Sequence, residues 1–395
     1  MTVAADAPAL GPMRDPDPGS LPAEPWVGLL GADPRPWLLA SDEPAARWIA
    51  LTALLDRPDA DPAVVSARAA VLTDPGTRAL IDRIPTWGAP LALSGHDSAL
   101  FAPSILGLLA DMGVRAGDHP RIGATLDAML EGRVVDAAGD ERLATFATSR
   151  VTPGGAWSAL LCDSHAIAET LVRYGRADDP RVVAALERMA ADLADTAQGR
   201  AWPCIAWDGF RGPGRKADLC PQVTCEALRT FAWLPEGRRP AGLDAVARTV
   251  LGSWLRRGEE KPYMFGHGFG FKTVKWPGFW YDALRLLDTI GRYPASWSDE
   301  AGRRAVAELA ACLVAYNVDA DGTVTPRSCS RGFEAYSFGQ KKRPSAYATA
   351  RVAQVLRPLG EITEEIRAVD VLALGSSKGG TGVPRPPRGW AAAAG

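Results

Sequence analysis

Residues 165–194 read HAIAETLVRYGRADDPRVVAALERMAADLA and contain one complete structural unit. The first part, 165–175, is apolar around most of its circumference and ends at a glycine, which is typical of a buried helix. Asp179 and Pro180 then begin a second helix, because proline is favoured at the first helical position. The residues that follow place apolar side chains at helical spacing on one face. The stretch therefore predicts a helical hairpin with an inner and an outer helix.

The same helix start recurs along the chain. Close variants of Asp179-Pro180-Arg-Val stand at 61–64, 119–122 and 239–242, and the four prolines are spaced by 58, 60 and 60 residues. A fifth start without proline is Ser298-Asp299-Glu300. The apolar segments before or between these starts are 48–55, 99–113, 165–175, 222–234, 280–291 and 346–356. The pattern predicts an all-α fold, an (α/α)6 toroid of about six helical hairpins around a central cavity; an open solenoid of hairpins is the alternative.

The totals agree with one large helical domain. The chain has 395 residues, of which 47% are hydrophobic and 23% charged, with a net charge of −2. We expect a single domain over 26–374, because one hairpin cannot bury its own apolar face. Residues 1–25 and 375–395 are rich in Pro, Gly, Ala and charged side chains and are predicted to be disordered tails.

Several classes of protein are disfavoured by the composition. No run of Lys or Arg indicates a nucleic-acid or anionic-membrane partner, and no apolar stretch approaches the 18 residues of a membrane span. The N-terminal residues lack the features of a secretory signal, and six cysteines are too few for a disulfide scaffold. We expect a cytoplasmic protein that binds a small molecule; the pattern leaves its oligomeric state open.

The long loops carry motifs that resemble a known superfamily. Gly155-Ala-Trp157 and Gly199-Arg-Ala-Trp202 resemble the repeat endings of squalene/terpene cyclases and protein prenyltransferases. The segments FRGPGRKADLCP (210–221), FGHGFGFKTVKWPGFWYDALRLLD (265–288) and FGQKKRPS (338–345) look like a group of short prokaryotic squalene cyclase-like proteins, over most of 40–360. The resemblance implies the toroid, and an isomerase, lyase or transferase of isoprenoid secondary metabolism.

The chain departs from the family in two respects. Squalene-hopene-type cyclases protonate an alkene with an Asp-x-Asp-Asp motif, whereas Asp319-Ala-Asp321-Gly322 lacks the final Asp and is typical of a turn. The Cys and His spacings of the zinc-dependent toroid enzymes are also missing. A zinc site built from Cys204, Cys220 and His165, with Cys225 nearby, is a weaker alternative to a disulfide or free thiols, so no cofactor is predicted.

Candidate site residues lie in the loops and at the starts of the inner helices, which we expect to gather at one end of the ring. Helix N-termini and basic side chains bind anions, and aromatic faces hold apolar bodies or carbocations. For proton transfer the candidates are His165, Asp163, Asp282 and His267, although a carboxylate at a helix start more often caps it. For substrate binding they are Arg211, Arg215, Lys216, Lys272, Lys275, Lys341, Lys342, Trp202, Trp207, Trp276, Trp280 and Tyr281.

Three functions follow from these residues. The first is a terpene cyclase- or prenyltransferase-like enzyme that takes an apolar substrate with an anionic head, and it predicts a deep aromatic-lined cavity. The second is a carbohydrate-active glycosidase or lyase with two carboxylates, drawn from Asp97, Asp163, Asp208, Asp282 and Glu334, and it predicts a polar groove. The third is a non-catalytic binding module. The resemblance favours the first.

Overall fold

The protein is described by a computed structural model that covers residues 21–89, 98–136, 139–147, 156–205, 217–260, 271–279 and 281–374. These residues are mostly helical, as predicted. Besides the helices of its main body, the described part of the chain has nine short or peripheral helical segments. These are α1 (Val27–Leu30), α2 (Arg35–Leu39), α5 (Pro75–Asp82), α12 (Arg257–Glu260), α17 (Thr363–Arg367) and the 3-10 turns Ala116–Asp118, Glu236–Arg238, Pro294–Trp297 and Arg357–Ile362. None of the described helices has the length and apolarity needed to cross a membrane.

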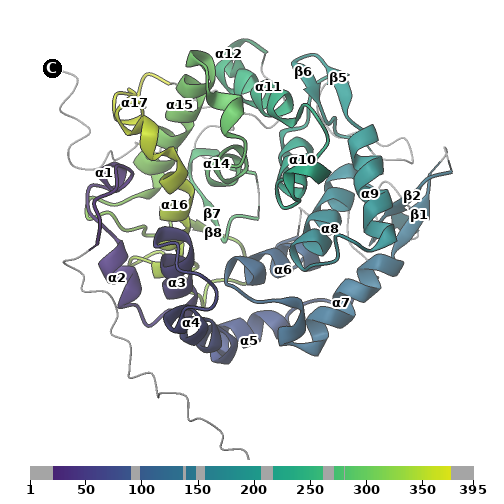
Figure 1. Ribbon diagram of the computed structural model, residues 1–395, viewed down its shortest axis with the longest axis horizontal. Helices are drawn as coiled ribbons and strands as arrows, with labels where there is room; N and C mark the ends of the chain where they lie inside the picture. The colour runs from purple at the N-terminus through teal and green to yellow at the C-terminus, as the bar shows by residue number, and fades with distance from the viewer. Residues whose placement is uncertain are drawn as a thin grey trace, which may run out of the picture.

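Two sets of helices make up the body of the molecule (Figure 1). The inner set lies toward the middle and comprises α3 (Pro44–Ile49), α6 (Ala102–Asp111), α8 (Leu161–Arg173), α10 (Pro221–Ala232), α14 (Ala283–Ile290) and α16 (Ala346–Leu356). The outer set comprises α4 (Pro62–Thr73), α7 (Pro120–Glu131), α9 (Pro180–Ala191), α11 (Leu243–Leu255) and α15 (Glu300–Asn317). A π-helical turn, Ala50–Leu54, continues α3. Along the inner set, α6 packs against α8, α8 against α10, α10 against α14 and α14 against α16. Helix α3 packs against α16, so the first and last inner helices are adjacent.

The predicted helix starts are confirmed at three of the four prolines. Pro62, Pro120 and Pro180 each occupy the first helical position, and the preceding Asp61, His119 and Asp179 accept a hydrogen bond from the backbone. The start at Pro240 is wrong: α11 begins three residues later at Leu243, after Gly242 adopts a left-handed φ of 84°. Asp299 caps α15 as expected, because its carboxylate accepts from the Gly302 amide at 2.7 Å.

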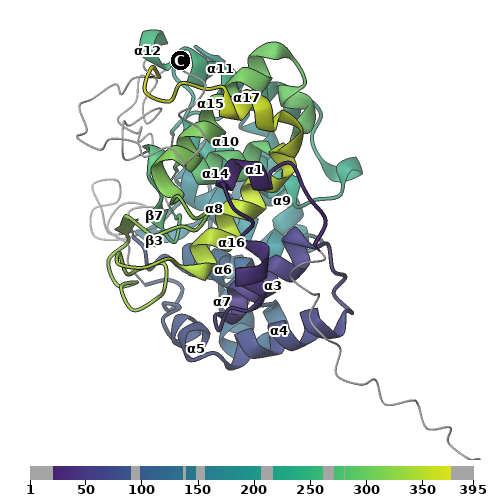
Figure 2. The same ribbon diagram turned by 90° about the vertical axis from the view of Figure 1, so that its left-hand side faces the viewer.

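Short strands occur where the sequence predicted loops. Three antiparallel pairs are β1–β2 (Arg133–Val135 and Glu141–Leu143), β3–β4 (Thr145–Ala147 and Ala156–Ser158) and β5–β6 (Ala194–Thr196 and Gly199–Ala201). A parallel pair joins β7 (Lys275–Trp276) to β8 (Ser328–Cys329). Figure 2 shows β3 and β7 on the same side of the helices. Because β4 and β7 precede α8 and α14, these ladders position the N-terminal ends of two inner helices.

The core lies between the two sets of helices. Side chains of α10 and α16 are buried around nearly their whole circumference, whereas α9 buries one face through Val182, Leu186 and Met189. This difference agrees with the predicted inner and outer positions. At the N-terminal edge, Glu24 forms ion pairs with Arg35 at 2.9 Å and with Arg357 at 3.1 Å, which connects the two ends of the fold. Of the predicted tails 1–25 and 375–395, residues 1–20 and 375–395 lie outside the described residues, whereas 21–25 are described and include Glu24.

Candidate functional site

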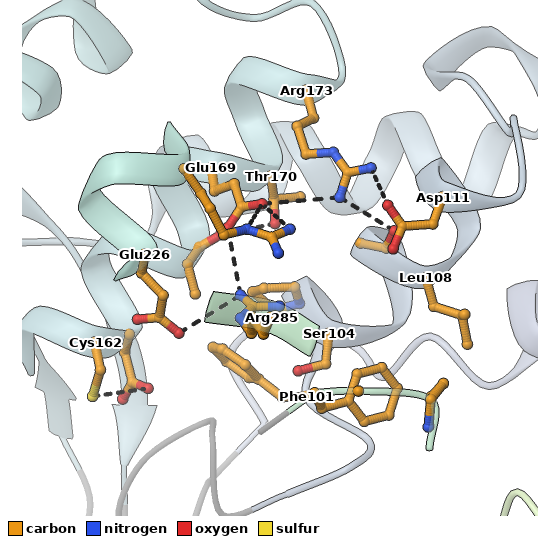
Figure 3. A pocket seen from close by; sticks show the side chains of 18 residues that line it. Phe101, Ser104, Leu108, Asp111, Cys162, Glu169, Thr170, Arg173, Glu226 and Arg285 are labelled. Atoms are coloured by element: carbon orange, nitrogen blue, oxygen red, sulfur yellow. Dashed lines mark hydrogen bonds and ion pairs between the residues drawn. The ribbon is translucent and has the colours of Figure 1, made fainter. Parts of the chain in front are cut away.

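A cleft opens among α6, α8, α10 and α14 (Figure 3). It holds about 630 Å³ of space not filled by protein, part of it open to solvent. Side chains spaced by three or four residues share one face of a helix, so α6, α8 and α10 each present two or more of them to the cleft, and α14 presents Arg285. The polar lining residues are Ser104, Asp111, Cys162, Asp163, Glu169, Thr170, Arg173, Glu226, Arg229 and Arg285; the aromatic ones are Phe101 and Phe279.

A ring of six alternating charges borders the cleft, and Asp111, Glu169, Arg173 and Arg229 of this ring line it. Six side chains from five inner helices form the ring, each beside an opposite charge on both sides. In order around the ring the contacts are Asp111–Arg173 (2.6 Å), Arg173–Glu169 (3.9 Å), Glu169–Arg229 (2.7 Å), Arg229–Asp288 (3.1 Å), Asp288–Arg351 (3.7 Å) and Arg351–Asp111 (3.4 Å). These groups neutralise one another, because a buried charge without a partner is strongly unfavourable.

The ring keeps its carboxylates ionised. Burial opposes ionisation of Glu169, yet the guanidinium groups of Arg229, Arg285 and Arg173 hold its pKa below the usual range. Burial likewise opposes ionisation of Asp288, and Arg292, Arg229 and Arg351 depress its pKa. We therefore assign the ring carboxylates a structural and electrostatic role, since a group ionised throughout the physiological range is a poor proton donor.

Glu226 on α10 behaves in the opposite way. Its side chain is 4% exposed, and burial raises its pKa to about 8; Arg285 and Gln222 oppose the rise, and the Glu169 and Asp163 carboxylates add to it. Gln222, one turn earlier, donates from Nε2 to Oε1 of Glu226. Oε2 is buried and has no hydrogen-bond partner among the described residues. Glu226 is therefore a carboxylic acid that stays protonated at neutral pH in a cleft.

Two further polar groups flank Glu226. Asp163, in the first turn of α8, is 1% exposed and accepts a hydrogen bond from Thr145 at 3.4 Å. Arg285, on α14, has Nη2 3.6 Å from Glu169 and 4.0 Å from Glu226, and its buried Nε has no hydrogen-bond partner within the described ranges. Arg173 and Arg229 contact carboxylates at 2.6 and 2.7 Å. Arg285 is thus the least closely paired arginine of the three that line the cleft.

The structure brings one of the predicted proton-transfer residues, Asp163, into this cleft. His165 is two residues further along α8, so it points to a different face and lies beside Arg142, Arg188 and Asp192. Its Nδ1 is 3.2 Å from the Val223 carbonyl oxygen, and burial lowers its pKa to about 4. His165 is therefore neutral at physiological pH and packs edge-on against Trp202.

Asp282 has the capping role that a carboxylate at a helix start suggests. It accepts from the Arg285 amide at 2.9 Å, at the N-terminus of α14, and burial raises its pKa to about 7. It is not among the residues that line the cleft. The fourth candidate, His267, lies outside the described residues, as do Arg211, Arg215, Lys216, Trp207, Trp280, Asp97 and Asp208.

The remaining predicted binding residues lie away from the cleft. Trp202, Trp276 and Tyr281 belong to the core: Trp202 donates to the Met189 carbonyl oxygen at 2.8 Å, and the other two are buried beside Tyr347 and Phe271. Lys272 is buried with Nζ 5.4 Å from the Tyr316 ring. The side chains of Lys275, Lys341, Lys342 and Glu334 are exposed.

The cysteines do not assemble a metal site in the described part of the chain. No group of three or more His, Cys, Asp or Glu side chains is placed there to hold a metal ion. A hydrogen bond with Cys204 and burial raise the pKa of the Cys220 thiol, so these two thiols are neighbours. None of the six cysteines forms a disulfide. The Asp319–Gly322 segment is the predicted turn, with Gly322 at a φ of 82°.

The cleft residues that the sequence analysis missed carry a recognisable pattern. Glu169 and Arg173, four residues apart, and Glu226 and Arg229, three apart, are charged residues on one face of helices that are largely buried. Charged side chains are almost never fully buried unless paired, so their recurrence within buried helices was the available signal. No protein-family model and no curated protein matches this chain.

Proposed function

We propose that the protein is an enzyme that transfers protons in the cleft, with Glu226 as the general acid. The single observation that carries this is a buried carboxylic acid with a pKa near 8 and an unpaired oxygen at a cleft wall. A catalytic acid is most effective when its pKa lies close to the working pH, because it is then protonated and still able to release its proton. The carboxylates of the charge ring, Asp111, Glu169 and Asp288, have their pKa shifted the other way.

Gln222 determines which oxygen of Glu226 donates. The amide Nε2 of Gln222 donates to Oε1 of Glu226, which is therefore the carbonyl oxygen of the neutral carboxyl group. The proton then belongs on Oε2, the oxygen that has no partner in the described part of the chain. A substrate atom in the cleft would accept it, and Asp163 supplies an adjacent carboxylate that can act as base or stabilise positive charge.

The polar cleft favours a hydroxylated, carbohydrate-like substrate and a hydrolase or lyase reaction. Ten of the lining side chains are polar or charged, which suits hydroxyl groups better than an isoprenoid chain. Trp202, Trp276 and Tyr281 are packed into the core, so they do not supply an aromatic wall. Two carboxylic side chains, one neutral and one flanking it, are the groups that glycoside cleavage requires. We therefore propose a glycosidase or lyase ahead of an enzyme of terpenoid chemistry.

A terpene cyclase- or prenyltransferase-like reaction is the second candidate. An apolar recess lined by Trp87, Phe101 and Phe146 adjoins the cleft, and Phe101 contributes to both. A substrate with a polar head in the cleft and an apolar body in this recess would fit the family resemblance.

We also propose that the helices form the closed (α/α)6 toroid of that superfamily. The charge ring through five inner helices and the packing of α3 against α16 support it.

The test compares wild type with Glu226→Gln. Purified protein is incubated with uronate-containing and neutral oligosaccharides and, separately, with isoprenoid diphosphates, and products are identified by mass spectrometry. Loss of one general acid lowers turnover by about 10²–10⁴-fold, so we expect Glu226→Gln to be nearly inactive. Glu131→Gln, on the exposed side of α7, is the matched control and should keep full activity. Wild-type turnover that survives Glu226→Gln contradicts the proposal, and turnover of isoprenoids alone favours the second candidate.

A further inference from the structure

Like Glu226, Arg285 has hydrogen-bonding capacity left over in the cleft. Its Nε is buried and has no partner in the described part of the chain, and its two ion contacts, at 3.6 and 4.0 Å, are longer than a hydrogen bond. Guanidinium donors removed from water without acceptors are unfavourable, so the arrangement is incomplete until an acceptor arrives. Figure 3 shows Arg285 between Glu226 and Ser104.

The charges that line the cleft limit what that acceptor can be. Three arginines (Arg173, Arg229, Arg285) and three carboxylates (Asp111, Asp163, Glu169) balance while Glu226 is protonated. Because these charges already balance, a bound anion adds net negative charge, and of the three arginines the incompletely paired Arg285 is the one with donor capacity for a single negative group. The two or three charges of a phosphate or diphosphate would exceed that capacity and lie close to the carboxylates of Asp163 and Glu169. The described wall of the cleft therefore suits a monoanion.

The geometry points to a carboxylate group of the substrate, bound by Arg285 beside Glu226. This inference rests on the proposed function and narrows it to an acidic, hydroxylated molecule such as a sugar acid. The planar guanidinium matches a carboxylate with two parallel N–H···O bonds, one of them from Nε. Ser104, Thr170 and Cys162 line the same cleft and add neutral polar groups to it.

Protonation of Glu226 should be coupled to this binding. The groups that face Glu226 are Gln222 on its own helix, Glu169 and Asp163 on α8, and Arg285 on α14. Above about pH 8 an ionised Glu226 would compete with the ligand for Arg285 and repel its carboxylate. Carboxylate binding should therefore weaken as the pH rises through this range.

The experiment measures binding of D-glucuronate, glucose, inorganic phosphate and pyrophosphate by ligand-observed NMR at pH 7. Wild type should bind glucuronate and discriminate against the other three. Arg285→Gln should weaken glucuronate binding by about tenfold or more, since a charge-assisted pair is lost. Arg285→Lys keeps the positive charge but lacks the planar guanidinium group. Its affinity for glucuronate should lie between those of wild type and Arg285→Gln. Arg304→Gln, an exposed arginine on α15, is the control and should bind as wild type does. Each variant is first checked for wild-type thermal unfolding, and Arg285→Lys keeps the test decisive if Arg285→Gln does not fold.

A second arm separates this inference from the proposed function. Glu226→Gln should still bind glucuronate at pH 7 and should lose the pH dependence of binding, even though it is inactive. Tighter binding of pyrophosphate than of glucuronate, or glucuronate binding unchanged in Arg285→Gln, overturns the carboxylate site. If glucuronate binding depends on Arg285 but turnover survives Glu226→Gln, the carboxylate site is supported and Glu226 is rejected as the general acid.

Discussion

Arg229 donates from both Nε and Nη2 to the same oxygen of Glu169, at 3.0 and 2.7 Å, and so joins α10 to α8 in the interior. The pair is one segment of the ring that also includes Asp288, Arg351, Asp111 and Arg173. Because each inner helix of the ring contributes at least one charged group, the ring fixes the rotation of these helices about their axes. The same rotation directs Glu226 and Asp163 into the cleft.

Breaking this pair should destabilise the protein strongly. Arg229→Met removes one partner of both Glu169 and Asp288, and leaving a buried charge incompletely paired costs about 3–5 kcal/mol. We expect a loss of that order in the free energy of unfolding, measured by urea denaturation. Arg303→Met is the control, because Arg303 pairs with Glu365 on the surface, and it should change stability little. Similar losses in the two variants would show that the ring is no more important than a surface pair.

Two glycines that follow inner helices allow packing and backbone strain to be separated. Gly113 after α6 and Gly175 after α8 both have left-handed φ, at 92° and 79°. A Cβ on Gly113 would lie 2.7 Å from the Trp48 ring, whereas a Cβ on Gly175 meets nothing within 4 Å. Gly175→Ala should therefore cost only the strain of about 1–2 kcal/mol. Gly113→Ala should lower the free energy of unfolding by more, and equal losses would exclude a contribution from Trp48.

The sequence predicted the helical class and most helix starts because local rules determine them. Proline at the first helical position and a capping Asp act within a few residues, so Pro62 and Pro180 were found. At Pro240 the same rule failed, because Gly242 in a left-handed conformation delays α11. The prediction of the site recovered Asp163 but favoured tryptophans that prove to be core. The cleft depends on which charged residues face one another across different helices, and a single sequence does not show that.

Removing the Gln222 side-chain amide should raise the pKa of Glu226. Gln222 donates to Oε1 and this hydrogen bond lowers the pKa of Glu226, because it stabilises the ionised form more than the neutral one. Gln222→Leu should therefore move the titration of Glu226 above its value of about 8. The measurement is a carbon-13 NMR titration of labelled glutamate side chains, with Glu226→Gln used to assign the signal. A lower value in Gln222→Leu would mean that the amide stabilises the neutral acid instead.

Asp282, the buried cap of α14, makes the free energy of unfolding depend on pH. Replacing its carboxylate with a neutral group should therefore stabilise the protein at high pH. Burial raises the pKa of Asp282 from 3.8 to about 7, so between these values the folded protein binds more protons than the unfolded chain. The free energy of unfolding therefore falls as the pH rises through this window and stays reduced above it. Asp282→Asn removes the charge and retains an oxygen that can accept from the Arg285 amide. Each unit by which folding raises the pKa of Asp282 lowers the free energy of unfolding above that pKa by about 1.4 kcal/mol.

We expect Asp282→Asn to be more stable than wild type at pH 8 and to lose that advantage at pH 4.5, as measured by urea denaturation at both values. The matched control is Asp299→Asn, which alters the cap of α15 at an exposed position and should show no gain at pH 8. The comparison separates the charge from the cap, because both substitutions exchange the same side chains at a helix N-terminus. If the difference between Asp282→Asn and wild type is the same at both pH values, ionisation of Asp282 does not limit the stability of the fold.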